Sequence, residues 1–259
     1  MLYVIDINYF LGVCMRNIKI SYSYDGSDFY GFQRQPDKRT VQGEIERVLG
    51  IILKKEINLV TAGRTDRGVH ARVQISNFMM ESSLTIPLEN LKRAMNKLLP
   101  PDIDIFDVSE ESMDFNARYM PKMRAYEYII TWKKDVFSRR YKTYIPKSVD
   151  PEKLKKILSV LIGKHDFNNF RIKDENNRTT IREIYKIDVY FKNESEIGIY
   201  IEGSAFLKTQ VRIIVGTALD VYFGRKSSDY LELLLNEPKK ERKIEVAEPG
   251  GLYLTKVEY

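Results

Sequence analysis

Two kinds of hydrophobic pattern alternate along the chain. RNIKISYSY at 16–24 places apolar and polar residues on opposite sides, which is the period of a half-buried strand. TVQGEIERVLGIILKK at 40–55 then changes to helical spacing, with Thr40 as the expected N-cap. The same patterns predict further elements in this half of the chain: strands at 57–62, 73–78 and 103–108, and a helix at 88–98 that ends before Pro100.

The second half of the chain repeats the order of elements but not the residues. Strands are expected at 126–132, 182–190, 197–202 and 251–259, and helices at 151–161 and 206–223. Each half then has the order βαββαβ, which is that of a ferredoxin-like unit. We therefore predict an α+β protein with two such halves, residues 15–110 and 111–259, whose mixed or antiparallel sheets join around a central cleft.

Residues 1–14 do not fit either half. MLYVIDINYFLGVC is apolar, but it is too short to span a bilayer, contains Asp6 and lacks the basic region of a signal peptide. Because a strand pattern begins immediately after Met15, we expect 1–14 to be an N-terminal extension or a misassigned start. We also expect no association with a membrane.

The composition is that of a soluble globular protein, with 43% hydrophobic and 30% charged residues. Lys and Arg number 42 against 36 Asp and Glu, and the resulting charge of +6 favours a polyanionic partner. Some of the 17 Tyr and 12 Phe can stack on unpaired bases, although most are expected in the core. With Cys14 as the only cysteine and His70 and His165 as the only histidines, we expect a reducing, cytoplasmic location and no metal site.

One loop concentrates polar and glycine residues between two apolar runs. It reads TAGRTDRGVHA at 61–71, and we expect Gly63 and Gly68 to adopt backbone conformations that other residues avoid. The side chains that such a loop presents are Arg64, Asp66, Arg67 and His70. A purely structural interpretation makes Asp66 a turn residue and His70 a loop residue whose ring holds the backbone by hydrogen bonding. No role follows from the sequence for Arg67.

Further stretches weaken the purely structural interpretation of the loop. MRAYEYII at 123–130 puts Arg124, Tyr126 and Tyr128 on one face of a strand. GSAFLKTQVRIIVG at 203–216 carries Arg212 in an apolar helix, where a charge is costly unless it is paired. The remaining stretches are YSYDGSDFYGFQRQP with TVQGEIE, HDFNNF with RTTIREI, and GLYLTKVEY at the end of the chain.

In this order and at these separations, the stretches resemble the TruA family of tRNA pseudouridine synthases. The resemblance runs from about Arg16 to Tyr259, and AGRTDRGVHA is its most specific motif. It implies the pseudouridine synthase fold and an enzyme that isomerises uridine to pseudouridine at positions 38, 39 and 40, in the anticodon stem-loop of tRNA. It also implies that the enzyme needs no cofactor and forms a homodimer.

The resemblance assigns roles to individual residues of this chain. Asp66 corresponds to the catalytic carboxylate, which acts as nucleophile or base on a flipped-out uridine. Arg64 corresponds to the arginine that helps to extract that uridine, and Tyr126 to the tyrosine that stacks on the base and assists in proton transfer. Arg212 corresponds to the arginine that pairs with the carboxylate and keeps it ionised. Leu254, within GLYLTKVEY, corresponds to a substrate-binding residue.

Two departures from the family pattern stand near these motifs. Val73 precedes Gln74 where the family usually has glycine, and Thr209 and Gln210 replace the His-Met pair that it favours. Neither departure touches the expected reacting groups. A divergent paralogue with altered substrate choice is the hypothesis that they raise.

Basic residues outside the motifs are candidates for steering RNA into the cleft, and their binding to phosphate predicts an affinity that falls with added salt. The candidates are Arg34, Lys38, Arg39, Lys92, Arg93, Arg139 and Arg140.

Two other functions fit parts of the sequence. A non-catalytic RNA-binding protein on the same scaffold would be expected to lose Asp66, Tyr126 or Arg212, and all three are present. A phosphate-handling hydrolase using the glycine loop would be expected to carry a Gly-Lys-Ser/Thr run, which the loop lacks.

Overall fold

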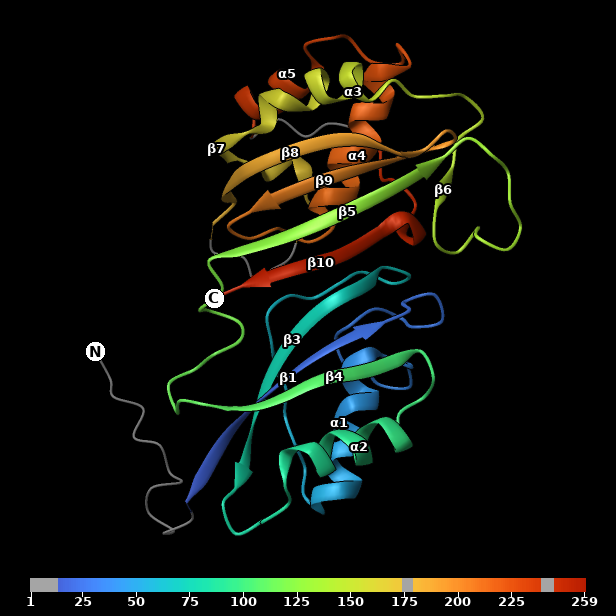
Figure 1. Cartoon of the computed structure of the whole chain (residues 1–259). Helices are drawn as coiled ribbons and strands as arrows, with labels where there is room; N and C mark the ends of the chain where they lie inside the picture. Colours follow the sequence, from blue (N-terminus) through green and yellow to red (C-terminus); the bar gives the residue numbers. More distant parts are fainter. Residues whose placement is uncertain (1–13, 174–178, 239–244) are drawn as a thin grey trace.

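A single mixed sheet runs through both halves of the chain (Figure 1). The structure, a computed structural model, describes residues 14–173, 179–238 and 245–259, so the expectation for residues 1–14 lies outside the described residues except at the exposed Cys14. The strands follow the order β4-β1-β3-β10-β5-β9-β8-β7, while β2 pairs with β3 and β6 with β5. The α+β class and the joining of the two sheets are thereby confirmed.

The bounds of the strands are β1 Met15–Tyr24, β2 Val60–Thr61, β3 His70–Glu81, β4 Ile103–Glu111, β5 Met123–Thr131, β6 Thr143–Tyr144, β7 Gly163–Asp166, β8 Ile181–Asn193, β9 Glu196–Gly203 and β10 Leu252–Glu258. The helices are α1 Val41–Leu53, α2 Leu88–Leu98, α3 Pro151–Leu158, α4 Gln210–Tyr222 and α5 Tyr230–Asn236.

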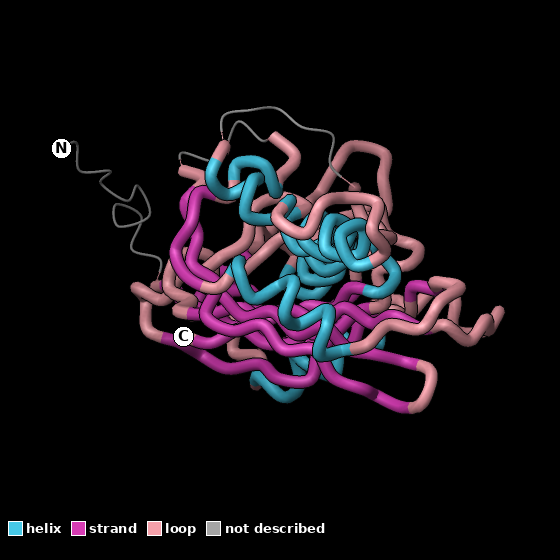
Figure 2. Tube along the Cα trace, turned by 90° about the horizontal axis from the view of Figure 1, so that it is seen from above, coloured by secondary structure: helices cyan, strands magenta, loops and turns pink. Residues whose placement is uncertain are grey.

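Helices gather mainly on one side of the sheet, as Figure 2 shows from above. The N-cap of α1 is Thr40, as predicted, and its hydroxyl accepts a hydrogen bond from the backbone N–H of Gly43. Helix α1 buries one apolar stripe, and α2 packs against both α1 and β4. In the other half, α3 packs against β8 and α4. The apolar stripes of the helices and the inner face of the sheet form a continuous core.

The last strand of the chain joins the two halves. β10 pairs antiparallel with β5, where Leu254 lies opposite Tyr126, and parallel with β3, where Leu254 lies beside Ala71. Every residue of β5 is buried, and the strand is paired with β10 along one edge and with β9 along the other. The sheet edges that two separate halves would expose are therefore paired at the centre of the molecule.

Several predicted boundaries were wrong, and two of these errors have an identifiable cause. The strand expected at 57–62 contains only Val60–Thr61, because the buried N–H of Leu59 donates to the Glu46 carboxylate instead of to a neighbouring strand. β3 begins at His70 rather than at residue 73. Helix α4 begins at Gln210 rather than at 206, because Thr209 has a left-handed backbone with φ of 65°. β6, β7 and α5 were not predicted.

Candidate active site

A pocket of about 300 Å³ opens where three loops meet beside the central strands. Its walls come from the loop after β1, the loop between β2 and β3, strand β5 and the segment before α4. The lining residues include Tyr30, Gln33, Arg64, Asp66, Arg67, Tyr126, Phe206 and Lys208. The predicted catalytic loop and the RAYEY strand thus reach the same pocket from different parts of the chain.

Two glycines allow the loops of this pocket to pack tightly. Gly68 has φ of +77° and Gly31 has φ of +95°, both in the region that favours glycine. A Cβ at Gly31 would lie 3.2 Å from the Thr65 carbonyl oxygen, and the Phe32 N–H donates to that same oxygen. The expectation for Gly63 was wrong: its φ lies outside the left-handed region, and an added Cβ would make only ordinary contacts, with the Tyr126 hydroxyl at 3.9 Å and Arg124 Nε at 4.0 Å.

Asp66 and Arg212 form the ion pair at the centre of the site. The Arg212 Nη1 donates to Asp66 Oδ2 at 2.9 Å, and the two side chains are only 16% and 21% exposed. The same guanidinium donates through Nε to the Ala247 carbonyl oxygen at 2.8 Å. Arg212 therefore holds the carboxylate from helix α4 while its own position is set by the segment before β10. This contact accounts for the charge in the apolar helix.

Tyr126 forms the inner wall of the pocket. Its ring is buried in β5 and meets the ring of Phe206 edge-on, with centroids 5.1 Å apart. Burial raises the pKa of Tyr126 to about 12; Arg124 opposes this shift and Asp66 adds to it. The hydroxyl therefore keeps its proton at neutral pH and is available as a donor, while Phe206 extends the aromatic wall.

Arg64 and Arg67 stand at the rim. Arg64 Nη1 donates to Gln33 Oε1 at 2.7 Å, and Arg64 lines the pocket together with Asp66. The Arg67 guanidinium lies over the Tyr30 ring, 4.3 Å from its centroid. The structure thus gives Arg67 a place that the sequence did not: it joins the catalytic loop to the loop after β1 by a cation–π contact.

Arg124 supports the backbone of the site. The sequence did not indicate it as a functional residue. It is buried and donates to three backbone carbonyl oxygens, those of Ala62, Arg118 and Ser204. Burial lowers the pKa of this guanidinium. None of these three partners is a carboxylate. The only indication of Arg124 in the sequence was its alternation with Tyr126 along the strand. Arg124 fixes the start of the catalytic loop relative to the segment that leads to α4.

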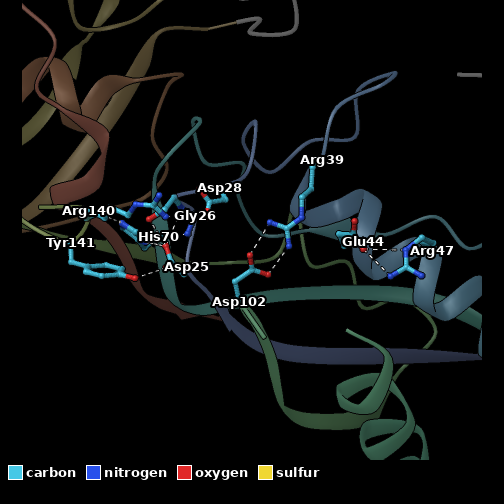
Figure 3. Close-up of polar contacts among 11 residues, drawn as sticks. Asp25, Gly26, Asp28, Arg39, Glu44, Arg47, His70, Asp102, Arg140 and Tyr141 are labelled. Carbon is cyan, nitrogen blue, oxygen red and sulfur yellow. Dashed lines mark hydrogen bonds and ion pairs between the residues drawn. The ribbon is translucent and has the colours of Figure 1, made fainter. Parts of the chain in front are cut away.

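His70 fastens the catalytic loop to a distant loop (Figure 3). The Gly26 N–H donates to its Nδ1 at 3.1 Å, so Nε2 carries the proton and donates to the Arg140 carbonyl oxygen at 3.0 Å. Asp25 lies 3.1 Å from Nδ1 and accepts a hydrogen bond from the Tyr141 hydroxyl. Burial lowers the pKa of His70 although Asp25 opposes this shift. The expected hydrogen-bonding role is confirmed, but at the first residue of β3 rather than within the loop.

Leu254 is fully buried in β10 beside Tyr126, and it is not among the residues that line the pocket. Its strand neighbour Leu252 instead lines a smaller adjoining cavity that also contacts Asp66 and Tyr126.

The basic residues predicted to bind RNA are mostly engaged with other groups and lie outside the pocket lining. Figure 3 shows Arg39 in a two-bond contact with Asp102, and Arg140 beside Asp28. The other contacts are Arg34 with Glu46, Lys92 and Arg93 with Glu89, Lys38 with the Tyr30 ring, and Arg139 with the Val136 carbonyl oxygen. Contacts within the protein therefore partly balance the charge of most of these residues.

Neither a metal-binding cluster nor a membrane-spanning helix is found in the part of the chain that the structure describes. In these residues, no group of three or more His, Cys, Asp or Glu side chains is arranged to hold a metal ion. No helix there is both long enough and apolar enough to cross a bilayer.

Comparisons with known proteins find matches over most of the chain. A family model described as tRNA pseudouridine synthase matches residues 20–120 and 157–259. Proteins named tRNA pseudouridine synthase A from Caldicellulosiruptor bescii and Dictyoglomus turgidum are 39% and 41% identical over 247 residues, 95% of this chain and all of each relative. One from Clostridium perfringens, tRNA pseudouridine synthase A 2, is 35% identical over 248 residues, again 95% of this chain and all of the relative. A solved Cbf5-Nop10-Gar1 complex matches with a TM-score of 0.38 and 12% identity over 91% of this chain and 57% of that one, too little to support an argument.

The structure sets a carboxylate held by an arginine beside an aromatic wall, and the family match makes the chain an enzyme of the pseudouridine synthase class. Enzymes of this class are isomerases. The chain belongs to the tRNA pseudouridine synthase family, the TruA family that its motifs indicated.

Proposed function

We propose that this enzyme converts uridine to pseudouridine at positions 38, 39 and 40 in the anticodon stem-loop of tRNA, with Asp66 as the catalytic nucleophile or base. The observation that carries the proposal is the Asp66–Arg212 pair, which sets one partly buried carboxylate at the pocket beside Tyr126. In this isomerisation the base is both leaving group and nucleophile, so the site needs an anion at the sugar or ring.

Other residues around the pocket bind and position the target uridine. Arg64 stands at the rim, where its guanidinium offsets part of the cost of unstacking the target uridine, which is a few kcal/mol. Tyr126 and Phe206 offer ring faces and edges to the extracted base. Leu254 is the last residue of the substrate-binding set. It lies opposite Tyr126 in β10 and acts by supporting that part of the sheet. Closure of this wall keeps water from a detached base.

The test compares the wild-type protein with Asp66→Asn on tRNA that carries tritium at carbon 5 of uracil. Wild type is expected to release tritium, because that carbon changes its bonding partner. Asp66→Asn is expected to bind tRNA with an affinity close to that of wild type but to release no tritium. Release by Asp66→Asn at the wild-type rate would refute the role of Asp66. Binding without release by both proteins would instead favour the non-catalytic RNA-binding alternative.

We extend the proposal to the partners of the enzyme. It acts in the cytoplasm as a homodimer, and the surface basic residues Arg34, Lys38, Lys92, Arg93, Arg139 and Arg140 contact phosphates of the tRNA, whereas Arg39 is held by Asp102 and Phe29 and does not. Exposed apolar side chains support self-association: Phe106, Met113, Tyr119 and Met120 are 44%, 60%, 76% and 45% exposed. Sedimentation equilibrium measures the oligomeric state directly, and a monomer at micromolar concentration would contradict the dimer.

A further inference from the structure

Gln210 holds a hydrogen-bond donor that the folded protein does not use. Gln210 is the first residue of α4 and only 1% exposed. Its Nε2 atom is covered from solvent and has no hydrogen-bond partner among the described residues. A buried donor without a partner costs about 1–3 kcal/mol. Such an atom is uncommon in a native structure and calls for a physical explanation.

The orientation of this amide is fixed. Oε1 of Gln210 accepts a hydrogen bond from the buried N–H of Leu207 at 2.7 Å. Rotating the amide by half a turn would place Nε2 against that N–H, so that two donors would face each other. The left-handed backbone of Thr209 makes this contact possible, because it ends the loop and starts α4 at Gln210. Nε2 is therefore a donor that cannot become an acceptor.

Gln210 lies beside the pocket that contains Asp66. Gln210 lines a cavity of about 30 Å³ together with Asp66, Tyr126 and Leu207. These three residues also line the 300 Å³ pocket, so the small cavity adjoins its inner end. A cavity of this size has room for one small polar group. An oxygen atom projecting from a bound base is a group of that size.

We propose that Gln210 is a specificity-determining residue of this enzyme, and that its Nε2 donates a hydrogen bond to a carbonyl oxygen of the pyrimidine at Asp66. The proposal rests on the proposed function, because it requires a base at that carboxylate. Uracil carries two carbonyl oxygens, whereas cytosine replaces one of them with an amino group, itself a donor. A fixed donor therefore favours a base with a carbonyl at the position that it faces.

The test is a cycle of protein and substrate changes. Gln210→Met removes the donor at nearly constant length, and conversion is measured on anticodon-arm substrates with uridine, 2-thiouridine or 4-thiouridine at the target position. Sulfur is a weaker acceptor than oxygen. On uridine, Gln210→Met is expected to lower kcat/KM by about ten- to a hundredfold, the range of one buried donor. On the thio-substrate in which sulfur replaces the carbonyl oxygen bonded to Nε2, Gln210→Met is expected to lower kcat/KM by less than threefold.

The same helix offers a matched control. Thr217 lies two turns along α4, is 2% exposed, and its hydroxyl also lacks a hydrogen-bond partner among the described residues. Thr217→Val removes an equally unused polar group away from the pocket and is expected to leave kcat/KM unchanged. If Gln210→Met fails to fold, Gln210→Glu keeps an acceptor for the Leu207 N–H and replaces the amide donor by a negatively charged carboxylate oxygen. It is then expected to show the same loss on uridine.

The outcomes separate the two proposals. No conversion of uridine by the wild-type protein would overturn the proposed function. Conversion by wild type, with Gln210 variants within threefold of it on all three substrates, would overturn the assignment of Gln210 alone. A loss that is equal on uridine and on both thio-substrates would also overturn it, because a purely structural role does not depend on the carbonyl oxygens.

Discussion

The Arg212 guanidinium makes two charge-assisted hydrogen bonds, and each links a different part of the site. One reaches Asp66 and the other reaches the carbonyl oxygen of Ala247. Because both side chains of the ion pair are mostly covered, solvent screens their attraction less than it would on the surface. Arg212 therefore sets the orientation of the Asp66 carboxylate, which we propose as the catalytic group.

Arg212→Met is expected to lower kcat by about 10- to 100-fold. A hydrogen bond to a charged group contributes about 1.5–3 kcal/mol, and 1.36 kcal/mol corresponds to a factor of ten in rate. Single-turnover conversion of tRNA measures this loss. Arg212→Lys is the control, since it keeps the charge near Asp66 but cannot make both contacts, and it should retain part of the activity. Wild-type kcat in Arg212→Met would show that the pair does not orient Asp66.

At the scale of elements, the catalytic loop depends on the segments that flank it. The loop after β1 packs against it at Gly31, the 133–147 connection is tied to β3 through His70, and α4 reaches it through Arg212. Tyr253 of β10 stacks on the His70 ring with centroids 4.7 Å apart. Four separate elements thus hold the loop around Asp66.

The His70 contacts predict a stability that depends on pH. Burial holds the pKa of His70 below its unfolded value of about 6.5, so protonation favours the unfolded chain. The stabilisation is complete above pH 6.5 and is lost as the pH falls below it. The pKa of Asp25 is also lowered, by hydrogen bonds that outweigh its burial, and this contribution is lost only below about pH 4.

His70→Gln is accordingly expected to lower Tm at pH 7.5 by several degrees, with a smaller deficit at pH 5. Thermal unfolding followed by circular dichroism at the two pH values measures the difference. His165→Gln removes the other histidine at a half-buried position and serves as the control. A deficit of His70→Gln that is constant from pH 7.5 to pH 5 would contradict the role of His70 ionisation.

At the scale of the whole molecule, tRNA binding should depend less on the net charge of +6 than on which basic side chains are already held in ion pairs. Arg39 is bound to Asp102 by two hydrogen bonds and stacks on Phe29, so its charge is largely used within the fold. Lys208 lines the pocket, is exposed, and has no ion-pair partner in the described part of the chain. Binding of tRNA should therefore depend more on Lys208 than on Arg39.

Lys208→Met is expected to weaken tRNA binding and to reduce the slope of log K against log salt concentration by about one. Arg39→Met should destabilise the fold yet leave that slope unchanged. Filter binding over a series of salt concentrations, together with thermal unfolding of both variants, tests the pair of statements. Equal slopes in wild type and Lys208→Met would show that Lys208 contacts no phosphate.

The sequence alone determined the local features of this protein. Helices α1, α2 and α3 and most strands follow from apolar spacing and the Thr40 cap, because those signals depend on neighbours within a few residues. The motif around Asp66 identified the family through residue types that its chemistry requires. Boundaries failed where a distant or unusual contact intervened, as at Leu59 and Thr209.

The family resemblance implied that Arg212 pairs with Asp66, and only the tertiary structure shows how the fold brings the two together. Asp66 and Arg212 are 146 residues apart, and they meet because β10 pairs with both β3 and β5 and thereby joins the two halves. The sequence did not indicate the unused donor of Gln210, since whether a polar atom has a partner depends on groups that folding brings together. Strand register between remote segments is a cooperative property of the whole chain, and no local pattern encodes it.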